Sequence, residues 1–417
     1  MAAGFDRADD PRSRRDGLGW VSRAVFPDPR LWLAVREPGV AAPPGWRVAA
    51  RYAVVPSADR ARFLLPLASR RVGAASTLAY NALRPPRVRA NRLAVGVLAG
   101  LGGTGLAGMP ELTVAVPASL DPAEAVLTVH LGRLLEAPLH AAIGIRPPDP
   151  HHKPTLQLFD DRGRPRAYAK IGWNDGTRAM ARAEAAALRR LGRSAGLPDV
   201  PRLLCAFDWG ELAVTVLEPM PARVRRLRHP DRPRLAAMLA VARRGGAPGR
   251  PRPLAGSAFL AELRRRAGSA HPDGADRVRR AVTALAERHG GTTIEFGDWH
   301  GDWVPWNLGT HRRRLIVWDW ENSGPDRPVG FDLAHQGFQT ALSMHGAPAA
   351  RAAERMSEVV DRHGPALGLG PDQRRLVCEA YLLELWLRTS ELAVGGAGWN
   401  DRLHPALLDL LAHRPTG

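Results

Sequence analysis

The chain has little cysteine, few acidic residues relative to basic ones and almost no long uncharged runs, and each shortage excludes a class of protein. Its 2 cysteines, Cys205 and Cys378, are too few for a disulfide framework and match no metal-binding spacing, which favours a reducing, cytoplasmic setting. The N-terminus is charged throughout and lacks the apolar core of a signal peptide. The longest uncharged run, Leu93–Pro110, is interrupted by glycines and ends at a proline. We interpret it as a helix end followed by a turn, and we expect no membrane partner.

The charge balance is strongly basic, with 59 Lys and Arg against 41 Asp and Glu, a formal net charge of +18. Such an excess would suit nucleotide, nucleic acid or an anionic membrane surface. The arginines are scattered, however, and a composition bias typical of a GC-rich coding sequence explains them as well. We favour the bias and expect no nucleic-acid partner, although the excess disfavours a polycationic substrate.

Length and pattern divide the 417 residues into four predicted parts. Residues 1–17 are polar and aperiodic, which predicts a disordered tail. Residues 18–137 predict an α/β accessory module, with strands from Trp46 and at 62–67 and 111–116. Its helices are expected over 72–98, interrupted by two prolines, and from the N-cap Asp121 to Glu136. Nothing in this module carries recognisable chemistry.

Residues 138–220 predict a five-stranded sheet, with strands at 140–145, 155–159, 166–171, 201–206 and 212–217. Lys170 lies inside the third strand, where its ammonium needs a partner. The helix expected over 177–191 offers Glu184 on its apolar side. A strand lysine paired with a glutamate of the next helix holds the α- and β-phosphates of ATP in kinase-like folds, so we predict that role for both residues.

Two further segments of this part are candidate nucleotide contacts. The turn at 145–154 (IRPPDPHHKP) has no G-x-G-x-x-G pattern; either its cationic side chains contact phosphates or it is a stiff surface loop. Glu218 and Met220 begin the crossing to the next part, where the backbone would meet the adenine.

Residues 221–417 predict a mostly helical part around a catalytic segment at 298–335. That segment contains His300, Asp302 and Asn307 in the spacing H-x-D-x-x-x-x-N, then an apolar strand at 315–318 and Asp319. Two acids and an amide in this spacing are typical of Mg²⁺-nucleotide phosphotransfer. Asp302 would orient the attacking hydroxyl, and Asn307 and Asp319 would ligate Mg²⁺.

The remaining polar and aromatic residues of the segment receive auxiliary roles. His300 is predicted to brace the catalytic loop by hydrogen bonds, Glu321 to support the metal site, and Asp332 to cap the following helix and brace the loop. The tryptophans at 306 and 318 are interpreted as rigid walls, while Trp303 is either a wall or a platform for the acceptor. For Glu379, Glu384 and Glu391 we favour a solvated helix face over acceptor binding.

The motifs HGDWVPWNL, LIVWDWENSGPDRPVGFDLAH and AYAKIG, with Glu184, resemble the aminoglycoside phosphotransferase and choline kinase superfamily. The resemblance covers about residue 139 to the end, apart from the unusual loop at 145–154. It implies an α+β, bilobal protein-kinase-like fold and transfer of the γ-phosphoryl group of ATP to a small-molecule hydroxyl. It also implies that Asp302 is the catalytic base, that Asn307 and Asp319 bind magnesium, and that Lys170 and Glu184 clamp the phosphates.

The sequence therefore predicts an ATP- and Mg²⁺-dependent kinase of a sugar, aminoglycoside or other alcohol, with no obligate protein partner. The alternative is a nucleotide-binding pseudokinase that acts as a scaffold through residues 18–137. The joint presence of Lys170, Glu184, Asp302 and Asn307 favours the enzyme, because a scaffold needs no base.

Overall fold

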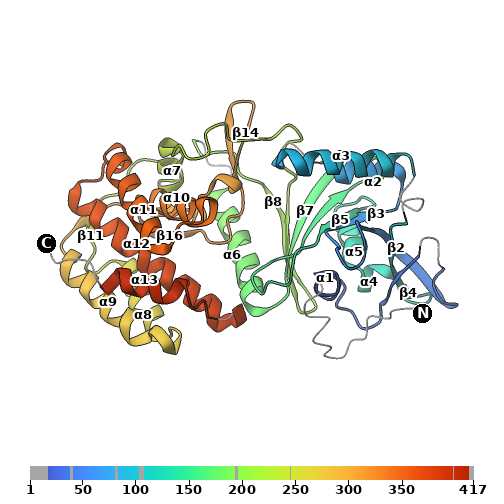
Figure 1. Cartoon of the computed structure of the whole chain (residues 1–417), viewed down its shortest axis with the longest axis horizontal. Helices are drawn as coiled ribbons and strands as arrows, with labels where there is room; N and C mark the ends of the chain where they lie inside the picture. The colour runs from blue at the N-terminus through green and yellow to red at the C-terminus, as the bar shows by residue number, and fades with distance from the viewer. Residues whose placement is uncertain are drawn as a thin grey trace. The chain divides into compact units, whose positions relative to one another are not determined.

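The computed structural model describes residues 17–37, 41–79, 83–102, 108–192, 196–244, 246–397 and 399–412. The chain forms an α+β structure with two compact units (Figure 1). Unit 1 contains the described residues up to Ala181 together with 202–224, and unit 2 contains residues 182–201 and those from 225 onward. Helix α6 (Asp175–Leu191) begins in unit 1 and ends in unit 2. The predicted tail lies outside the described residues except for Gly17, the first residue of α1.

Unit 1 is built on one nine-stranded antiparallel sheet with the order β1-β4-β2-β3-β5-β6-β7-β9-β8. The strands are β1 (Trp32–Arg36), β2 (Trp46–Val55), β3 (Phe63–Pro66), β4 (Glu111–Pro117), β5 (His140–Gly144), β6 (Thr155–Phe159), β7 (Pro165–Gly172), β8 (Leu203–Trp209) and β9 (Leu212–Leu217). All five strands predicted at 140–217 are present. The strands from residues 18–137 extend the same sheet, because β3 pairs directly with β5. The boundary predicted near residue 137 therefore falls inside this sheet.

Helices cover both faces of the sheet in unit 1. They are α1 (Gly17–Val25), α2 (Arg70–Leu78), α3 (Pro86–Gly100), α4 (Pro122–Ala125) and α5 (Leu127–Leu134). Successive residues of β2 and β3 point to opposite faces: Val54 and Leu64 join the core with α1, α4 and α5, and Ala53 and Leu65 pack on α3. Figure 1 shows α2 and α3 side by side along one face.

Three local results differ from the sequence-based expectation. Helix α1 and strand β1 were not predicted. The helix expected from Asp121 to Glu136 does begin with Asp121 as its cap, whose Oδ1 accepts a hydrogen bond from Ala123 N at 3.1 Å. It is broken at Val126, which adopts φ −113° and ψ 105°. Val126 is fully buried, and the extended backbone of this β-branched residue separates α4 from α5.

Unit 2 is mainly helical. Its helices are α7 (Leu235–Ala242), α8 (Ala258–Gly268), α9 (Ala275–His289), α10 (Phe331–Gln339), α11 (Ala349–His363), α12 (Pro371–Leu392) and α13 (Leu403–Ala412). Short strands β13 (Phe296–Trp299) and β16 (Gly324–Pro328) pair with each other, and the hairpin β14 (Leu308–His311) to β15 (Arg314–Val317) pairs with β10 (Arg225–Arg226).

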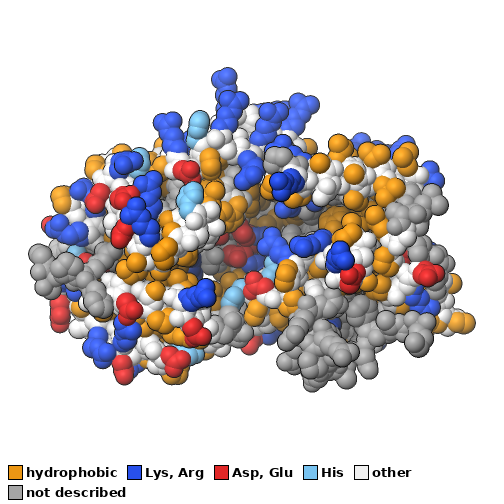
Figure 2. Space-filling model, in the orientation of Figure 1, with side chains coloured by type: hydrophobic (Ala, Val, Ile, Leu, Met, Phe, Trp, Pro, Cys, Tyr) orange, Lys and Arg blue, Asp and Glu red, His pale blue; other side chains and the backbone are white. Residues whose placement is uncertain are grey.

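The basic turn at 311–314 joins β14 to β15 as an exposed hairpin turn. Figure 2 shows Lys and Arg side chains gathered around the β14–β15 hairpin, and Arg312, Arg313 and Arg314 are all exposed. Arg312 and Arg313 have left-handed backbones, with φ of 48° and 68°. Among the described residues, no helix combines the length and apolar character needed to cross a bilayer.

Candidate active site

Within the predicted catalytic segment, the loop after strand β13 leads into β14 through a short 3-10 turn at Pro305–Asn307. Gly301 adopts φ +79°, and a Cβ atom there would lie 2.0 Å from the carbonyl oxygen of Asn322. Only glycine fits this position, because a side chain would meet both the left-handed backbone and that carbonyl. Arg388 of α12 donates to the Gly301 carbonyl at 2.6 Å. The backbone conformation of Gly301 and its hydrogen bond with Arg388 thus fix the turn that precedes Asp302.

His300 joins the catalytic segment to the end of β15. Its Nδ1 accepts from Asp302 N at 3.2 Å, and its Nε2 donates to the Trp318 carbonyl at 3.0 Å. Trp318 N in turn donates to the Asn307 carbonyl at 3.1 Å. Burial lowers the pKa of His300 to about 4, so the ring stays neutral with its proton on Nε2. The predicted bracing geometry of His300 is present.

Asp332 braces the same segment but does not cap its helix. Its carboxylate accepts from His300 N at 2.9 Å and Gly301 N at 3.1 Å. The N-cap of α10 is Gly330, with φ 109°, and Asp332 is the second helical residue. The predicted capping role is therefore wrong, because the left-handed backbone at Gly330 starts the helix two residues earlier than expected. Burial raises the pKa of Asp332 to about 7.

Asp302 accepts a hydrogen bond on each carboxylate oxygen. His335 Nε2 lies 3.0 Å from Oδ1, and Asn307 Nδ2 lies 2.7 Å from Oδ2. Burial alone would raise the pKa of Asp302, but the hydrogen bond from His335 and the charge of Arg388 lower it below the ordinary value. The Asp302 side chain is 27% exposed, so an incoming hydroxyl can reach it. The arrangement presents an ionised, oriented carboxylate to solvent.

Two residues behind Asp302 were not assigned a role from the sequence. The Tyr381 hydroxyl lies 3.0 Å from His335 Nδ1, and both side chains are completely buried. Burial lowers the pKa of His335 and raises that of Tyr381, so both are neutral. The Tyr381 hydroxyl then donates to Nδ1, and Nε2–H donates to Asp302. His335 follows the D-L-A motif directly, but only the fold brings Tyr381 to it.

Three carboxylates of unit 2 form a candidate metal group. Oxygen atoms of Glu184, Asp319 and Glu321 all lie within 4.8 Å of one another. Glu184 is completely buried, and its Oε1 accepts from Trp320 N at 3.3 Å. Asp319 has a left-handed backbone, with φ 72°, directly after β15. Oxygen-rich acidic sets of this kind fit a hard cation such as Mg²⁺.

The predicted nucleotide contacts of unit 1 lie on its sheet and in the adjoining loop. Lys170 is half-buried in β7, between Thr155 of β6 and Thr215 of β9. It lies in unit 1 and Glu184 lies in unit 2, so their pairing stays a prediction. Glu218 N donates to the Arg202 carbonyl at 2.8 Å, and the Glu218 side chain is exposed. Met220 follows it and is half-buried.

The loop at 145–154 is held by side chains from the far end of β7. Trp173 Nε1 donates to the His152 carbonyl at 3.0 Å, and Asn174 Nδ2 donates to the Pro150 carbonyl at 2.9 Å. Lys153 is only 6% exposed. Both predicted interpretations of the loop, phosphate contact and stiff cover, stay open.

The tryptophans of the segment divide into buried and exposed members. Trp303 is completely buried, which excludes it as an acceptor platform and makes it a wall. Trp306 is 46% exposed, so the wall predicted for it is wrong. Its neighbours Pro305 and Asn307 turn inward within the 3-10 turn, which leaves Trp306 outside. Trp318 is half-buried.

Two of the three glutamates of α12, Glu379 and Glu384, are buried, contrary to the favoured interpretation of a solvated face, whereas Glu391 is exposed. Glu384 Oε2 lies 2.7 Å from Arg266 Nη1, and both side chains are buried. Arg266 also binds Glu391 at 2.7 Å, and Glu379 pairs with Arg288 of α9 at 2.7 Å. Ion pairs with arginines of α8 and α9 therefore explain how the two buried glutamates are accommodated.

Comparison with known proteins gives structural likenesses only. No family model matches the chain, and no curated protein matches it. A thermostable mutant of aminoglycoside phosphotransferase APH(4)-Ia, solved with ADP and hygromycin B, shares 14% identity over 70% of this chain and 99% of its own, with a TM-score of 0.45. A putative fructosamine-3-kinase from Haemophilus somnus shares 12% identity over 69% and 97%, with a TM-score of 0.42. A choline/ethanolamine kinase family protein from Mesorhizobium loti shares 16% identity over 63% and 86%, with a TM-score of 0.35.

The solved structures similar to this chain are small-molecule kinases. They include the families to which the sequence motifs point. At these identities and TM-scores the likeness does not identify a substrate or a site. The support for a function comes instead from the residues around Asp302 and from the candidate metal group.

Proposed function

We propose that the chain is an ATP- and Mg²⁺-dependent phosphotransferase that acts on a hydroxyl of a small molecule. The observation that carries this proposal is the set of hydrogen bonds around Asp302. Asn307 and His335 hold its carboxylate, and His300 and Asn307 connect its loop through Trp318 to Asp319. An accessible, ionised acid is thereby tied to a group of metal-type ligands, as phosphoryl transfer requires.

In this proposal Asp302 orients the acceptor hydroxyl and takes its proton as the bond to phosphorus forms. Each Asp302 oxygen accepts one hydrogen bond and retains capacity for another, so the acceptor can bind without displacing His335 or Asn307. The low pKa of Asp302 means that it is ionised at neutral pH. A strong base is unnecessary, because the transition state of phosphoryl transfer is loose and positioning dominates.

Asp319, Glu321 and Asn307 would hold Mg²⁺, and Lys170 and Glu184 would position the phosphates. Asp319 and Glu321 fit this ion, since their carboxylate oxygens lie within 4.8 Å of each other and of Glu184, and negative charges so close together favour a bound cation. Bound Mg²⁺ supplies neutralisation of phosphate charge. Glu218 and Met220 would contact the adenine of ATP through their backbone. A cytoplasmic setting would supply the nucleotide.

Nucleotide turnover with a panel of hydroxyl compounds tests the proposal. The full chain should form ADP from Mg-ATP in the presence of at least one acceptor. Asp302→Ala should lower this rate about 10²- to 10⁴-fold while nucleotide binding is retained. Asp361→Ala, which removes an exposed carboxylate from α11, is the matched control and should leave the rate unchanged.

Binding of Mg-ATP without transfer to any acceptor would contradict the proposal. It would favour the pseudokinase alternative, in which the nucleotide is bound and the base is idle. Mass spectrometry of the phosphoproduct formed in a cell extract would identify the acceptor.

A further inference from the structure

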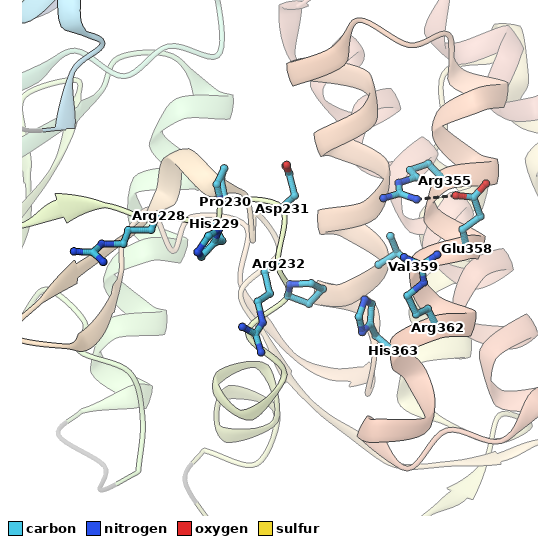
Figure 3. Close-up of a pocket in the computed structure, with 11 residues that line it drawn as sticks. Arg228, His229, Pro230, Asp231, Arg232, Arg355, Glu358, Val359, Arg362 and His363 are labelled. Atoms are coloured by element: carbon cyan, nitrogen blue, oxygen red, sulfur yellow. Dashed lines mark hydrogen bonds and ion pairs between the residues drawn. The ribbon is translucent and has the colours of Figure 1, made fainter.

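A cavity of about 500 Å³ lies within unit 2, between the connector at 228–233 and helix α11 (Figure 3). Neither Asp302 nor any residue of the candidate metal group lines this cavity. Its size is that of pockets which hold small organic molecules. The connector is basic and contains prolines at 230 and 233.

The lining of this pocket is predominantly cationic. Arg228 and Arg232 come from the connector, and Arg355 and Arg362 lie about two turns apart on α11. The acidic lining residues are Asp231 and Glu358. Glu358 is already paired, since its Oε2 lies 2.8 Å from Arg355 Nη1, as the dashed line in Figure 3 marks. The pocket therefore retains more positive than negative charge.

Of the two histidines that line the pocket, His229 and His363, the second reflects this positive field. Burial lowers the pKa of His363, and the charges of Arg362 and Arg355 lower it further. The pKa of Glu358 is lowered by its hydrogen bond with Arg355 and by the charges of Arg351 and Arg362. Both lowered pKa values show that the surroundings of these two groups favour negative charge.

The pocket is connected to the helix that carries His335. Gln336 Nε2 donates to the carbonyl of Pro230 at 3.3 Å, and Pro230 lines the pocket. Gln336 is almost completely buried and directly follows His335, which contacts Asp302. A ligand that orders the connector would therefore also restrain α10 at Gln336, next to His335.

We propose that this pocket binds a small organic anion through its phosphate or carboxylate group. The planar guanidinium groups of Arg232 and Arg362 would pair with the anionic oxygens, because the fork of an arginine matches either group in a bidentate manner. Prolines at 230 and 233 restrict the connector, which limits the ordering that binding requires. The site holds the anion whether that molecule is the phosphoryl acceptor of the proposed function or a separate ligand.

Calorimetric titration of the full chain with two sugar acids tests the pocket. Glucose 6-phosphate and glucuronate present the two anionic groups, and glucose is the neutral control. Saturable binding of at least one anion, and weaker binding of glucose, is expected. The double variant Arg232→Gln with Arg362→Gln should weaken anion binding at least about 10-fold, since hydrogen bonds to charged groups are lost.

Arg351→Gln is the matched control, because Arg351 lies on α11 outside the pocket and pairs with Glu354. It should bind the anion as the wild type does, and Arg232→Lys with Arg362→Lys should recover part of the affinity. Asp302→Ala should also bind normally, so failure of catalysis and failure of the pocket are distinguishable. ADP formation with the bound anion would identify it as the acceptor, whereas binding without turnover would identify a separate ligand.

Three outcomes would overturn the proposal. The first is absence of saturable binding of both anions at millimolar concentration, and the second is equal binding of glucose. The third is unchanged affinity in a double variant whose circular dichroism shows it to be folded.

Discussion

Asp302 is held from two sides by side chains that approach along different elements. Asn307 belongs to the same loop, whereas His335 lies in α10 and is itself held by Tyr381 of α12. The buried imidazole can satisfy both partners only with its proton on Nε2. The orientation of the carboxylate is therefore set before an acceptor binds, which lowers the ordering needed for transfer.

Loss of His335 should shift the pH dependence of transfer. The Asp302 pKa is below the ordinary value partly because His335 donates to it, so removal of that donor raises the pKa. Activity requires the carboxylate and rises with pH through this pKa, so the acid limb of kcat/KM should move to higher pH in His335→Leu. At neutral pH, kcat should fall on the order of 10-fold. The pH profile of kcat/KM measures the shift.

His335→Gln keeps an N–H donor and should restore part of the lost rate and of the profile. Tyr381→Phe should leave the donor to Asp302 in place and give a smaller effect. An acid limb that does not move in His335→Leu would show that His335 fills space only.

The candidate metal group of Glu184, Asp319 and Glu321 should bind a divalent cation without nucleotide. Replacement of Asp319 by Asn removes one charge from a set of three, so affinity for Mn²⁺, a paramagnetic substitute for Mg²⁺, should fall at least about 10-fold. Electron paramagnetic resonance of free Mn²⁺ measures this directly. Asp361→Asn is the exposed control, and equal Mn²⁺ binding by both variants would exclude Asp319 as a ligand.

At residue scale the spacing of His300, Asp302 and Asn307 predicts that they lie close together, because they belong to one continuous loop. The sequence does not predict Tyr381, which lies 46 residues from its partner His335 and within an apolar helix pattern. It also does not predict the exposure of Trp306, which lies in a 3-10 turn between the buried Pro305 and Asn307.

At the scale of elements, helices α9 and α12 are joined by an ion pair between the exposed Arg288 and the buried Glu379. Burial alone would raise the pKa of Glu379, but His289 and Arg288 outweigh it and lower the pKa to about 2. The ordinary value is 4.5, so this pair stabilises the fold fully above that pH, and its contribution is lost as pH falls toward 2. The size of the shift corresponds to about 3 kcal/mol.

Glu379→Gln should therefore lower the free energy of unfolding at pH 7 by about 2–3 kcal/mol and flatten its dependence on pH below 4.5. Urea unfolding at a series of pH values measures both. Glu287→Gln, an exposed position of α9, should change neither. An equal loss of stability at every pH would assign the effect to packing instead of charge.

Most elements follow from local patterns, and the exceptions have local reasons. Alternation of apolar residues predicts β5, β6, β7, β8 and β9, and Ser257 is the N-cap of α8, with its Oγ accepting from Leu260 N at 3.1 Å. Strand β1 escapes prediction because it is a short edge strand, half-buried at four of its five positions. The α10 cap is missed because a glycine starts the helix without a side-chain acceptor.

At the scale of the molecule, the sheet of unit 1 joins residues 18–137 to the strands that contain Lys170. Phe63 pairs with Gly144 and Leu64 with Ile143, and the main core of unit 1 includes residues from both sides of residue 137. Sequence alone did not reveal this continuity, because strand order depends on pairings between distant segments.

A chain that begins at residue 138 should fail to fold cooperatively. It would expose the edge of β5 and the core residues that α1, α4 and α5 cover, which favours aggregation. Expression of this fragment beside the full chain, with thermal unfolding followed by circular dichroism, tests the expectation. A soluble fragment with a sharp transition would instead support an independent accessory module.

The continuous sheet also has a consequence for the order of events during synthesis. Every strand of unit 1 lies between Trp32 and Leu217, whereas Asp302, His335 and Tyr381 all come later in the chain. Domains generally fold as units, beginning with the N-terminal one, while translation continues. The sheet of unit 1 can therefore form while Asp302, His335 and Tyr381 are still untranslated. The strand that contains Lys170 would then be complete before the proposed catalytic base, Asp302, has been synthesised.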